Sequence, residues 1–461
     1  MGAPLVVGVD SSTQSVKVEA RRLDTGELVG VGTARHPVTT PPVSEQDPTA
    51  WWDALVEACS ALGACRDDVV AIAVAGQQHG LVLLDEHGDP LRPAKLWNDT
   101  TSAPQSERLV SEFGADTWAA RIGSVPVASF TITKLAWVAE HEPDSIARAA
   151  RVMLPHDYLT WRLTGEHVTD RGDASGSGWF DAATGAVHLD LLAAATGADW
   201  SGRVPAVLDA TVAAGALVPE AAEALGLPLG IVVGAGTGDN MGAALGLGLR
   251  PGDVAISLGT SGTAFAVSST PTRDPSGAVA GFASASGDFL PLVCTLNATK
   301  VTDTVARWLG TDASGLADLA LAAVTDPGSV ALVPYFDGER TPNLPDATGT
   351  FSGLTNATTR EQLALAAYDG VLRGLLAGRE ALRDAGASVD GRIFLIGGGS
   401  RSSAYRQRCA DLSGQDVLVP TTDETVATGA AVQAAVVAGS GTFSELATRW
   451  NLGAGTTVHP T

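Results

Sequence analysis

Residues 5–20, LVVGVDSSTQSVKVEA, and residues 253–269, DVAISLGTSGTAFAVSS, have the same form. In each, an apolar strand leads into a turn of small polar residues, which are Asp10–Ser15 and Gly259–Thr263, and a second strand follows. Such a pattern is typical of a β-hairpin. Because one hairpin opens each half of the chain, we expect a duplicated domain with a cleft between the copies. A chance likeness of two hairpins is the alternative.

The segments around the first hairpin alternate between strand and helix. Residues 44–62, SEQDPTAWWDALVEACSAL, predict a helix with Asp47 as N-cap and Pro48 at its first position. VVAIAVAG, residues 69–76, predicts a buried strand. Strands mixed with crossover helices indicate an α/β fold with an at least partly parallel sheet. Glycine and proline gather at Gly248–Asp253, so we expect two domains, 1–248 and 249–461.

Composition excludes some classes of function. The formal net charge of −22 argues against a nucleic-acid partner, which requires a basic surface. It does not argue against ATP, because backbone N–H groups and a divalent cation can hold a nucleotide. No stretch predicts a membrane span or a signal peptide, and the four cysteines have no metal-ligand spacing, so we expect a cytoplasmic protein. The oligomeric state stays open, a homodimer included.

Four polar or glycine-rich turns carry the candidate chemistry: Asp10–Ser15, Leu258–Thr263, Gly397–Ser400 and Gly234–Asn240. The first turn could bind a hydrated Mg²⁺ and phosphate oxygens, or its Asp and Ser side chains could only accept hydrogen bonds from backbone N–H groups of the turn. The second and third let a nucleotide approach the backbone, although neither is a P-loop and each also fits an ordinary turn. The sequence pattern alone does not decide between these interpretations.

Asp239 lies in the fourth turn, between a predicted strand and a predicted helix. A helix N-terminus favours an ionised carboxylate, which could accept the proton of a substrate hydroxyl during phosphoryl transfer. An aspartate at this place could equally be a helix cap. The position alone is compatible with both roles.

The four turns in this order, on two similar halves, resemble the FGGY family of carbohydrate kinases, relatives of actin. Residues 349–354, GTFSGL, with Gln362-Leu363 and Ala366–Asp369, resemble the family's C-terminal signature. SEQDPTAWW, AGQQHGLVLLD, LRPAKLWND, LPHDYLTWRLTGE, SLGTSG, GERTP and LIGGGSRS are similar, in order, to segments of the family's xylulose-phosphorylating branch. The likeness extends from residue 5 to about residue 435, nearly the whole chain.

The resemblance implies two actin-like (ribonuclease H-like) domains, ATP and Mg²⁺ as cofactors, and D-xylulose as the sugar, phosphorylated to D-xylulose 5-phosphate. Asp239 matches the catalytic base, and Asp10 matches the acid that places the metal through water. The sugar-binding positions implied are Gln78, His79, Trp97, Asn98, Asp99, Asp239 and Asn240. The nucleotide-binding positions implied are Ser12, Thr13, Gln14, Gly259, Thr260, Ser261, Gly397, Gly398 and Gly399. Arg340, in GERTP, receives no role.

Three departures from the family pattern stand near these positions. The first turn reads DSSTQS where relatives often have DLGTS, Gln78 stands where methionine is common, and His156 replaces a lysine. Gln78 leaves the sugar preference open, so a kinase of ribulose, gluconate or glycerol is a competing interpretation. The sequence is also compatible with an actin-like ATPase without sugar kinase activity and with an inactive sugar sensor, although Asp239 argues against the sensor.

Overall fold

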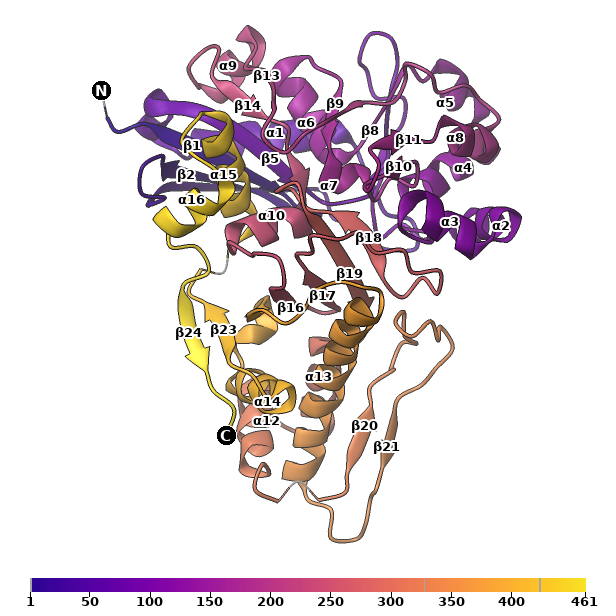
Figure 1. Ribbon diagram of the computed structural model, residues 1–461, viewed down its shortest axis with the longest axis vertical. Helices are drawn as coiled ribbons and strands as arrows, with labels where there is room; N and C mark the ends of the chain where they lie inside the picture. Colours follow the sequence, from indigo (N-terminus) through magenta and orange to yellow (C-terminus); the bar gives the residue numbers. More distant parts are fainter. Residues whose placement is uncertain (1, 327, 423) are drawn as a thin grey trace.

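The computed structural model describes residues 2–326, 328–422 and 424–461. In this part of the chain, two mixed seven-stranded sheets form the cores of an upper and a lower half (Figure 1). The upper sheet has the order β13-β14-β5-β1-β2-β3, and β15 also pairs with β5. Its strands are β1 (Leu5–Ser11), β2 (Ser15–Arg22), β3 (Leu28–Arg35), β5 (Val69–Gly76), β13 (Ala213–Ala216), β14 (Val232–Gly234) and β15 (Thr237–Gly238).

The lower sheet repeats this topology in the order β18-β19-β17-β16-β22-β23-β24. Its strands are β16 (Val254–Leu258), β17 (Gly262–Ala266), β18 (Ala280–Ala283), β19 (Phe289–Thr295), β22 (Ile393–Ile396), β23 (Val417–Pro420) and β24 (Gly455–Val458). In both sheets the opening hairpin is antiparallel, and its first strand pairs in parallel with a later one, β5 or β22. The duplication predicted from the two hairpins is therefore present in the fold.

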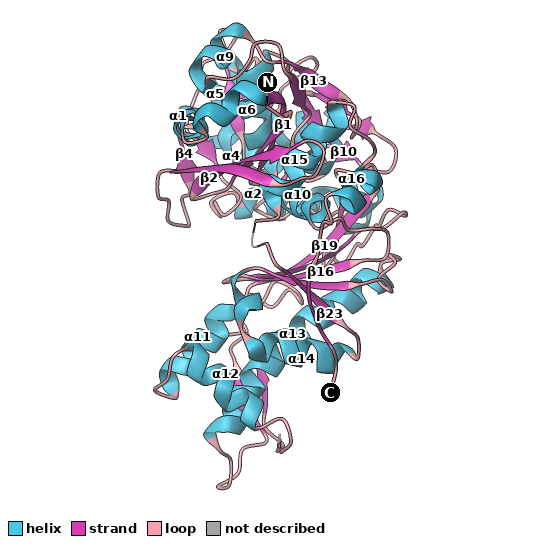
Figure 2. Cartoon of the chain, turned by 90° about the vertical axis from the view of Figure 1, so that its left-hand side faces the viewer, coloured by secondary structure: helices cyan, strands magenta, loops and turns pink. Residues whose placement is uncertain are grey.

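Helices cover both sheets (Figure 2). Those from the first half of the chain are α1 (Pro48–Ser60), α2 (Ala103–Phe113), α3 (Ala115–Ile122), α4 (Thr131–His141), α5 (Pro143–Arg148), α6 (Pro155–Thr164), α7 (Arg171–Ala174), α8 (Leu189–Thr196), α9 (Pro219–Leu225) and α10 (Asp239–Gly246). Those from the second half are α11 (Thr299–Trp308), α12 (Ala313–Ala322), α13 (Arg360–Asp384), α14 (Ser403–Ser413), α15 (Val426–Val437) and α16 (Phe443–Arg449). As predicted, Asp47 caps α1, accepting from the Thr49 N–H.

Two short 3₁₀ helices, Gly63–Asp68 and Gly398–Arg401, and five short strand pairs complete the described elements. The pairs are β4 (Glu45–Gln46) with β7 (Ala94–Lys95), β6 (Val82–Leu84) with β8 (Arg151–Met153), β9 (Val168–Asp170) with β12 (Ala206–Leu208), β10 (Phe180–Asp181) with β11 (Ala186–Val187), and β20 (Ala331–Val333) with β21 (Thr350–Ser352). No helix in the described ranges is long and apolar enough to cross a membrane. The four cysteines are free thiols.

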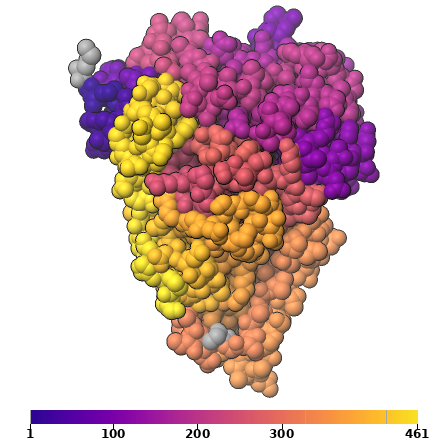
Figure 3. All heavy atoms as spheres, viewed as in Figure 1, coloured from indigo at the N-terminus to yellow at the C-terminus, as the bar shows by residue number. Residues whose placement is uncertain are grey.

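Two helices, α10 and α15, lie between the halves and pack against each other. α15, from the second half of the chain, packs on β1 and β5, where its alanines join Val6, Ala71 and Ala73 in one apolar cluster. α10, from the first half, packs in a cluster with Phe265 and Phe394 of the lower sheet. In Figures 1 and 3 the C-terminal segment accordingly reaches from the lower half onto the upper one. Residues 426–449 therefore pack on the upper half although they come from the second half of the chain.

Candidate active site

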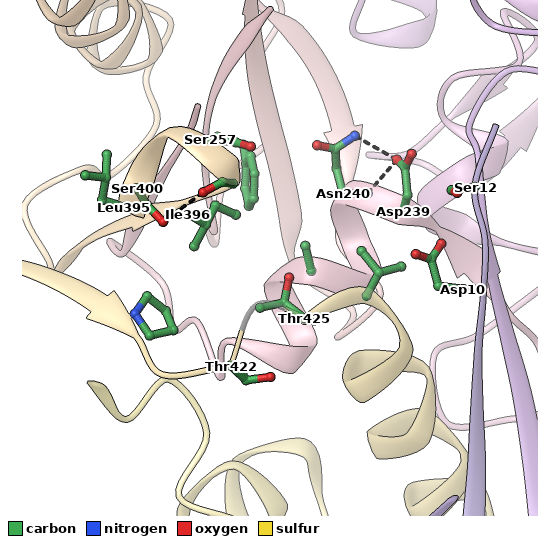
Figure 4. A pocket seen from close by; sticks show the side chains of 15 residues that line it. Asp10, Ser12, Asp239, Asn240, Ser257, Leu395, Ile396, Ser400, Thr422 and Thr425 are labelled. Carbon is green, nitrogen blue, oxygen red and sulfur yellow. Dashed lines mark hydrogen bonds between the residues drawn. The ribbon is translucent and has the colours of Figure 1, made fainter. Parts of the chain in front are cut away.

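A cavity of about 280 Å³ lies where the two sheets face each other, close to α10 and the start of α15 (Figure 4). Asp10, at the end of β1, and Asp239, at the start of α10, line it from the upper half. Ser257, Ile396 and the turn after β22 line it from the lower half. Acidic and hydroxyl side chains from both halves therefore face a common space.

A second cavity, of about 160 Å³, lies on the other side of Asp239 and Asn240, which line both spaces. Gln78 and His79, which follow β5, contribute to its wall from the upper half. Residues from the lower half contribute the remainder, including Ser261, Thr263, Phe282 and Arg340. The side chain of Asp239 could therefore contact a molecule in either cavity.

The surroundings of Asp239 suit a proton acceptor. Burial raises the pKa of its carboxyl to about 6, against the lowering effect of hydrogen bonds from Asn240. Both the backbone N–H and the side-chain amide of Asn240 donate to Oδ1, at 2.7 and 2.8 Å. Since no described residue donates to Oδ2, that oxygen is available to a substrate hydroxyl. A base with a pKa near neutrality is well matched to proton transfer.

Asp10 has an unsatisfied carboxylate oxygen. Its Oδ1 is buried and has no hydrogen-bond partner among the described residues. Burial, followed by the negative charges of Glu424 and Asp239, raises the pKa of Asp10 well above its usual range. A cation bound here would satisfy the oxygen and relieve the repulsion, so these residues fit a divalent metal. No cluster of three or more potential metal ligands occurs in the described ranges, which is compatible with a metal held mostly by water and phosphate.

Gln78 presents an unsatisfied polar atom at the second cavity. Asn240 donates to Gln78 Oε1 at 2.7 Å, while Gln78 Nε2 is buried without a partner in the described structure. Since buried polar groups normally have partners, this amide nitrogen is suited to binding a ligand's hydroxyl group. His79 Nδ1 lies against the backbone of Gly176, where an added Cβ would be 2.2 Å from it.

His79 is held in an unusual conformation and is uncharged. Its φ of 65° is in the left-handed region, and its ring stacks on Phe130 with centroids 5.2 Å apart. Burial, with the positive charges of Lys134 and Arg340, lowers its pKa to about 3. The neutral ring can therefore both donate and accept a hydrogen bond at neutral pH.

The segment Trp97–Asp99 is only partly in the predicted place. Trp97 lines the second cavity, and its indole N–H donates to Thr13 Oγ1 at 2.9 Å. Asn98 lines neither cavity, although its Oδ1 is buried without a partner in the described ranges. Asp99 is fully buried and also lines neither cavity, because it accepts from Ser44 N at 2.8 Å and pairs with Lys95 at 3.2 Å. These bonds, with those from Thr101, outweigh burial and lower the pKa of Asp99, so the carboxylate supports the loop beneath the cavity.

A third cavity, of about 660 Å³, opens beside the lower sheet. Gly259, Thr260, Gly398 and Gly399 line it, together with residues of α11, α12 and α14. Gly397, the residue before Gly398, lines the first cavity. Its φ of 82° and its closeness to Leu258, whose carbonyl oxygen would lie 2.8 Å from an added Cβ, require glycine here. An elongated ligand could extend from the third cavity towards Asp10.

The turn residues of the two hairpins face different spaces. Ser12 lines the first cavity, but the Thr13 hydroxyl is engaged by Trp97 and Gln77, and Gln14 is exposed and lines none of the three cavities. Ser261 lines the second cavity, whereas Gly259 and Thr260 line the third. The structure therefore separates predicted nucleotide-binding residues that are adjacent in the sequence.

Several polar residues at these cavities were not singled out from the sequence. They are Ser257, Thr422 and Thr425 at the first cavity, Ser129 and Cys294 at the second, and Thr299, Asp303, Arg401 and Ser402 at the third. Glu424, whose charge acts on Asp10, also went unnoticed. A run of polar residues between the β23 and α15 segments, PTTDET, was the available signal for the first cavity and for Glu424.

Comparison with known proteins decides the family. Residues 5–246 match the N-terminal domain of the FGGY family of carbohydrate kinases, and residues 254–438 match its C-terminal domain. The chain belongs to this family. It is accordingly an enzyme, a sugar kinase whose second substrate is ATP, with the actin-like two-domain fold that the sequence predicted.

Relatives of this FGGY kinase resemble it over nearly their full length. The xylulose kinase of Streptomyces coelicolor is 50% identical, covering 98% of this chain and 92% of the relative. The xylulose kinase of Escherichia coli is 38% identical, covering 90% of this chain and 86% of the relative. The crystal structure of xylulose kinase from Bifidobacterium adolescentis superposes with a TM-score of 0.88 at 45% identity, covering 95% of this chain and 94% of that one.

Proposed function

We propose that this kinase transfers the γ-phosphoryl group of ATP to the 5-hydroxyl of D-xylulose. Asp239 carries the proposal, because it lies in the wall shared by the first and second cavities. A hydroxyl bound in the second cavity would there meet a phosphate that enters through the first. The sugar itself is inferred from relatives called xylulose kinase that are up to 50% identical over nearly the whole chain.

The second cavity is the proposed sugar site. Gln78 Nε2, which lacks a partner in the described structure, and the His79 ring, which lines the cavity, would bind the hydroxyl groups remote from the reacting carbon. Asn240, fixed between Gln78 and Asp239, would orient the reacting end. Trp97 covers this wall with an indole that is 42% exposed. Asn98 and Asp99 stay predicted sugar-site residues, Asp99 only through its support of the loop.

The first and third cavities together form the proposed ATP site. Adenosine would lie in the third, against Gly398 and Gly399, and the phosphates would extend past Gly397 towards Ser12 and Asp10. Asp10 would hold Mg²⁺ through water, which fits its unpartnered oxygen and its acidic neighbours. The chemistry that the bound metal supplies is neutralisation of charge on the phosphate oxygens. Gln14, which is exposed, would contribute only through the backbone of the turn.

Phosphoryl transfer depends chiefly on positioning and on charge stabilisation. Asp239 Oδ2 would accept a hydrogen bond from the sugar hydroxyl, orient its oxygen towards phosphorus, and take the proton as the new bond forms. Hydrogen bonds from Asn240 to Oδ1 hold the carboxylate for this task. Because the halves line the cavities jointly, their approach would exclude water and so limit hydrolysis of ATP.

A panel of sugars in an ATP-consumption assay tests the substrate. D-xylulose should give the highest kcat/KM among ketoses, aldoses and polyols, and the product should carry phosphate on C5. D-ribulose, which differs in one hydroxyl orientation, should be about 5- to 150-fold poorer, since one lost hydrogen bond costs roughly 1–3 kcal/mol. Equal activity with ribulose, gluconate or glycerol would contradict the choice of xylulose and leave the sugar kinase intact.

The cellular location, the domain division and the oligomeric state of the enzyme are also proposals. Four free cysteines and the use of ATP fit a cytoplasmic enzyme. We also propose that the chain is divided along its sequence into a mainly sugar-binding domain, 1–248, and a mainly ATP-binding domain, 249–461. A homodimer is compatible with these features, and sedimentation analysis would test it.

A further inference from the structure

Beneath the proposed sugar site, one buried histidine meets three buried carboxylates. His156, the second residue of α6, has Nε2 3.2 Å from Asp157 Oδ1, 3.4 Å from Asp170 Oδ1 and 3.5 Å from Asp173 Oδ2. All four side chains are at most 3% exposed. No other cation in the described part of the chain forms an ion pair with these carboxylates. Such a cluster is costly to bury unless its charges are balanced.

The carboxylates connect His156 to both sides of the reaction centre. Asp173 Oδ1 accepts a 3.4 Å hydrogen bond from the backbone N–H of His79, whose neutral ring lines the sugar cavity. Asp170 Oδ2 accepts a 2.8 Å bond from the hydroxyl of Thr237, two residues before Asp239. The same Asp170 accepts from the N–H groups of Gly172 and Asp173, which fixes the turn that carries Asp173.

His156 also lies directly against the ends of two strand segments, with its ring at one and its Cβ at the other. A Cβ added to Gly236, in the turn before Asp239, would lie 2.5 Å from His156 Nδ1. A Cβ added to Gly76, at the end of β5, would lie 3.1 Å from the His156 Cβ. These glycines make room for a side chain wedged between the segment that ends in Gln78-His79 and the segment that ends in Asp239.

From this geometry we propose that His156 is a positioning residue, whose positive charge holds Asp170 and Asp173 so that His79 and Asp239 stay in register for sugar binding and transfer. The proposal rests on the proposed function of the sugar cavity. Burial by itself would lower the pKa of His156, but the carboxylates outweigh it and raise the pKa to about 9. Burial raises the pKa of Asp173, and so do the charges of the nearby acids. The weakest of these effects comes from Asp239, which lies just beyond the cluster.

Substitutions that separate charge from shape test the proposal. His156→Lys keeps a cation and should change the KM for xylulose less than about threefold. His156→Gln keeps the approximate shape without the charge and should raise that KM at least tenfold and lower kcat, with the KM for ATP within twofold of the wild-type value. His167→Gln is the matched control, because the ring of His167 hydrogen-bonds among the described residues only with the Val152 carbonyl oxygen, at 3.0 Å, and should leave all three constants unchanged.

A folded His156→Gln enzyme with wild-type constants for xylulose would overturn the proposal. So would equal losses for ATP and sugar in both His156 variants, because a purely structural residue would produce them. If His156→Gln does not fold, Asp173→Asn, which removes one carboxylate and leaves His156, should still raise the sugar KM selectively, and an unchanged KM would contradict the proposal.

The charge itself can be measured without any substrate. In ¹⁵N-histidine-labelled protein, the two ring-nitrogen resonances that are missing from the spectrum of His156→Lys belong to His156. At pH 7.5 they should have the chemical shifts of an imidazolium. Neutral shifts for that ring would overturn the proposal whatever sugar the enzyme phosphorylates. Conversely, charged shifts combined with no xylulose kinase activity would count against the proposed substrate only.

Discussion

At Asp239, the position that favours proton acceptance also makes the carboxyl sensitive to acid. Burial raises its pKa to about 6, so the carboxylate is present above that pH and is lost as the pH falls through it. We expect kcat/KM for the sugar to be flat above about pH 7 and to fall about tenfold per unit below pH 6.

Asp239→Asn should keep sugar affinity, since the amide preserves the shape, while lowering kcat by about 10²–10⁴-fold. A kcat loss under about fivefold would remove Asp239 from the catalytic role.

Asp10 makes a different prediction, because its proposed partner is the hydrated metal. Asp10→Asn removes the charge that would attract Mg²⁺ and also relieves the repulsion with Glu424 and Asp239. The variant should need at least tenfold more Mg²⁺ for half-maximal rate, while its affinity for xylulose stays within about twofold. Titrating activity with Mg²⁺ at saturating ATP measures this. A shift in sugar affinity alone, at unchanged Mg²⁺ dependence, would contradict the assignment.

Sequence patterns indicated those site residues that lie at the end of a strand. Asp10 is near the end of β1, Gln78 and His79 come shortly after β5, and Asp239 follows β15; parallel strands bring such ends to one edge of a sheet. Glu424 and Arg340 could not be found in this way, because they reach the site from loops whose course depends on tertiary packing. Asp99 is the opposite case, a residue that was predicted at the sugar site but lines no cavity. Nothing in the sequence reveals that Lys95 and Ser44 bind its carboxylate away from the cavity.

Between the elements, the closest approach is that of α10 and α15. A Cβ on Gly429 of α15 would lie 1.8 Å from the carbonyl oxygen of Gly242 in α10, and one on Gly246 would lie 1.9 Å from that of Thr425. The helix backbones are therefore in direct contact; α15 packs on the upper sheet, and α10 shares an apolar cluster with Phe265 and Phe394 of the lower one. Both hairpins and the parallel strands were predictable from local pattern, but this packing was not, because an alanine-rich helix gives no sign of which sheet it covers.

Gly429→Ala should therefore be strongly destabilising, although alanine favours a helix. Overpacking a tight contact typically costs about 1–3 kcal/mol, and contact with backbone leaves little room for relief. Gly374→Ala in α13 is the matched control: nothing lies within 4 Å of the added Cβ, so helix propensity should stabilise it by about 0.5–1 kcal/mol. Urea denaturation compares the two. Equal effects would show that the α10–α15 contact adjusts without cost.

Across the whole molecule, these two helices join halves that each supply part of both proposed substrate sites. Gln78 and His79 face the sugar cavity from the upper half, and Ser261 and Arg340 face it from the lower half. A bound sugar and nucleotide would thus gain contacts when the halves approach, so ligands should favour the closed arrangement by their differential affinity for it. The halves are also joined beside β18, where the Ala283 N–H donates to Ser175 Oγ at 2.9 Å and Arg273 pairs with Asp181 at 3.0 Å, so closure would have to turn about both connections.

Closure should be visible as a smaller radius of gyration in small-angle scattering. Xylulose with a non-hydrolysable ATP analogue should decrease the radius relative to the free enzyme, and either ligand alone should give a smaller decrease, because each fills only part of the interface between the halves. Asp239→Asn offers an independent version of the experiment, since it should bind xylulose and ATP itself while turning over slowly. Superimposable profiles with and without both ligands, at concentrations where calorimetry shows binding, would mean that the halves are already in their final positions. The shared wall at Asp239 would then have to align the hydroxyl and the phosphate by side-chain movement alone.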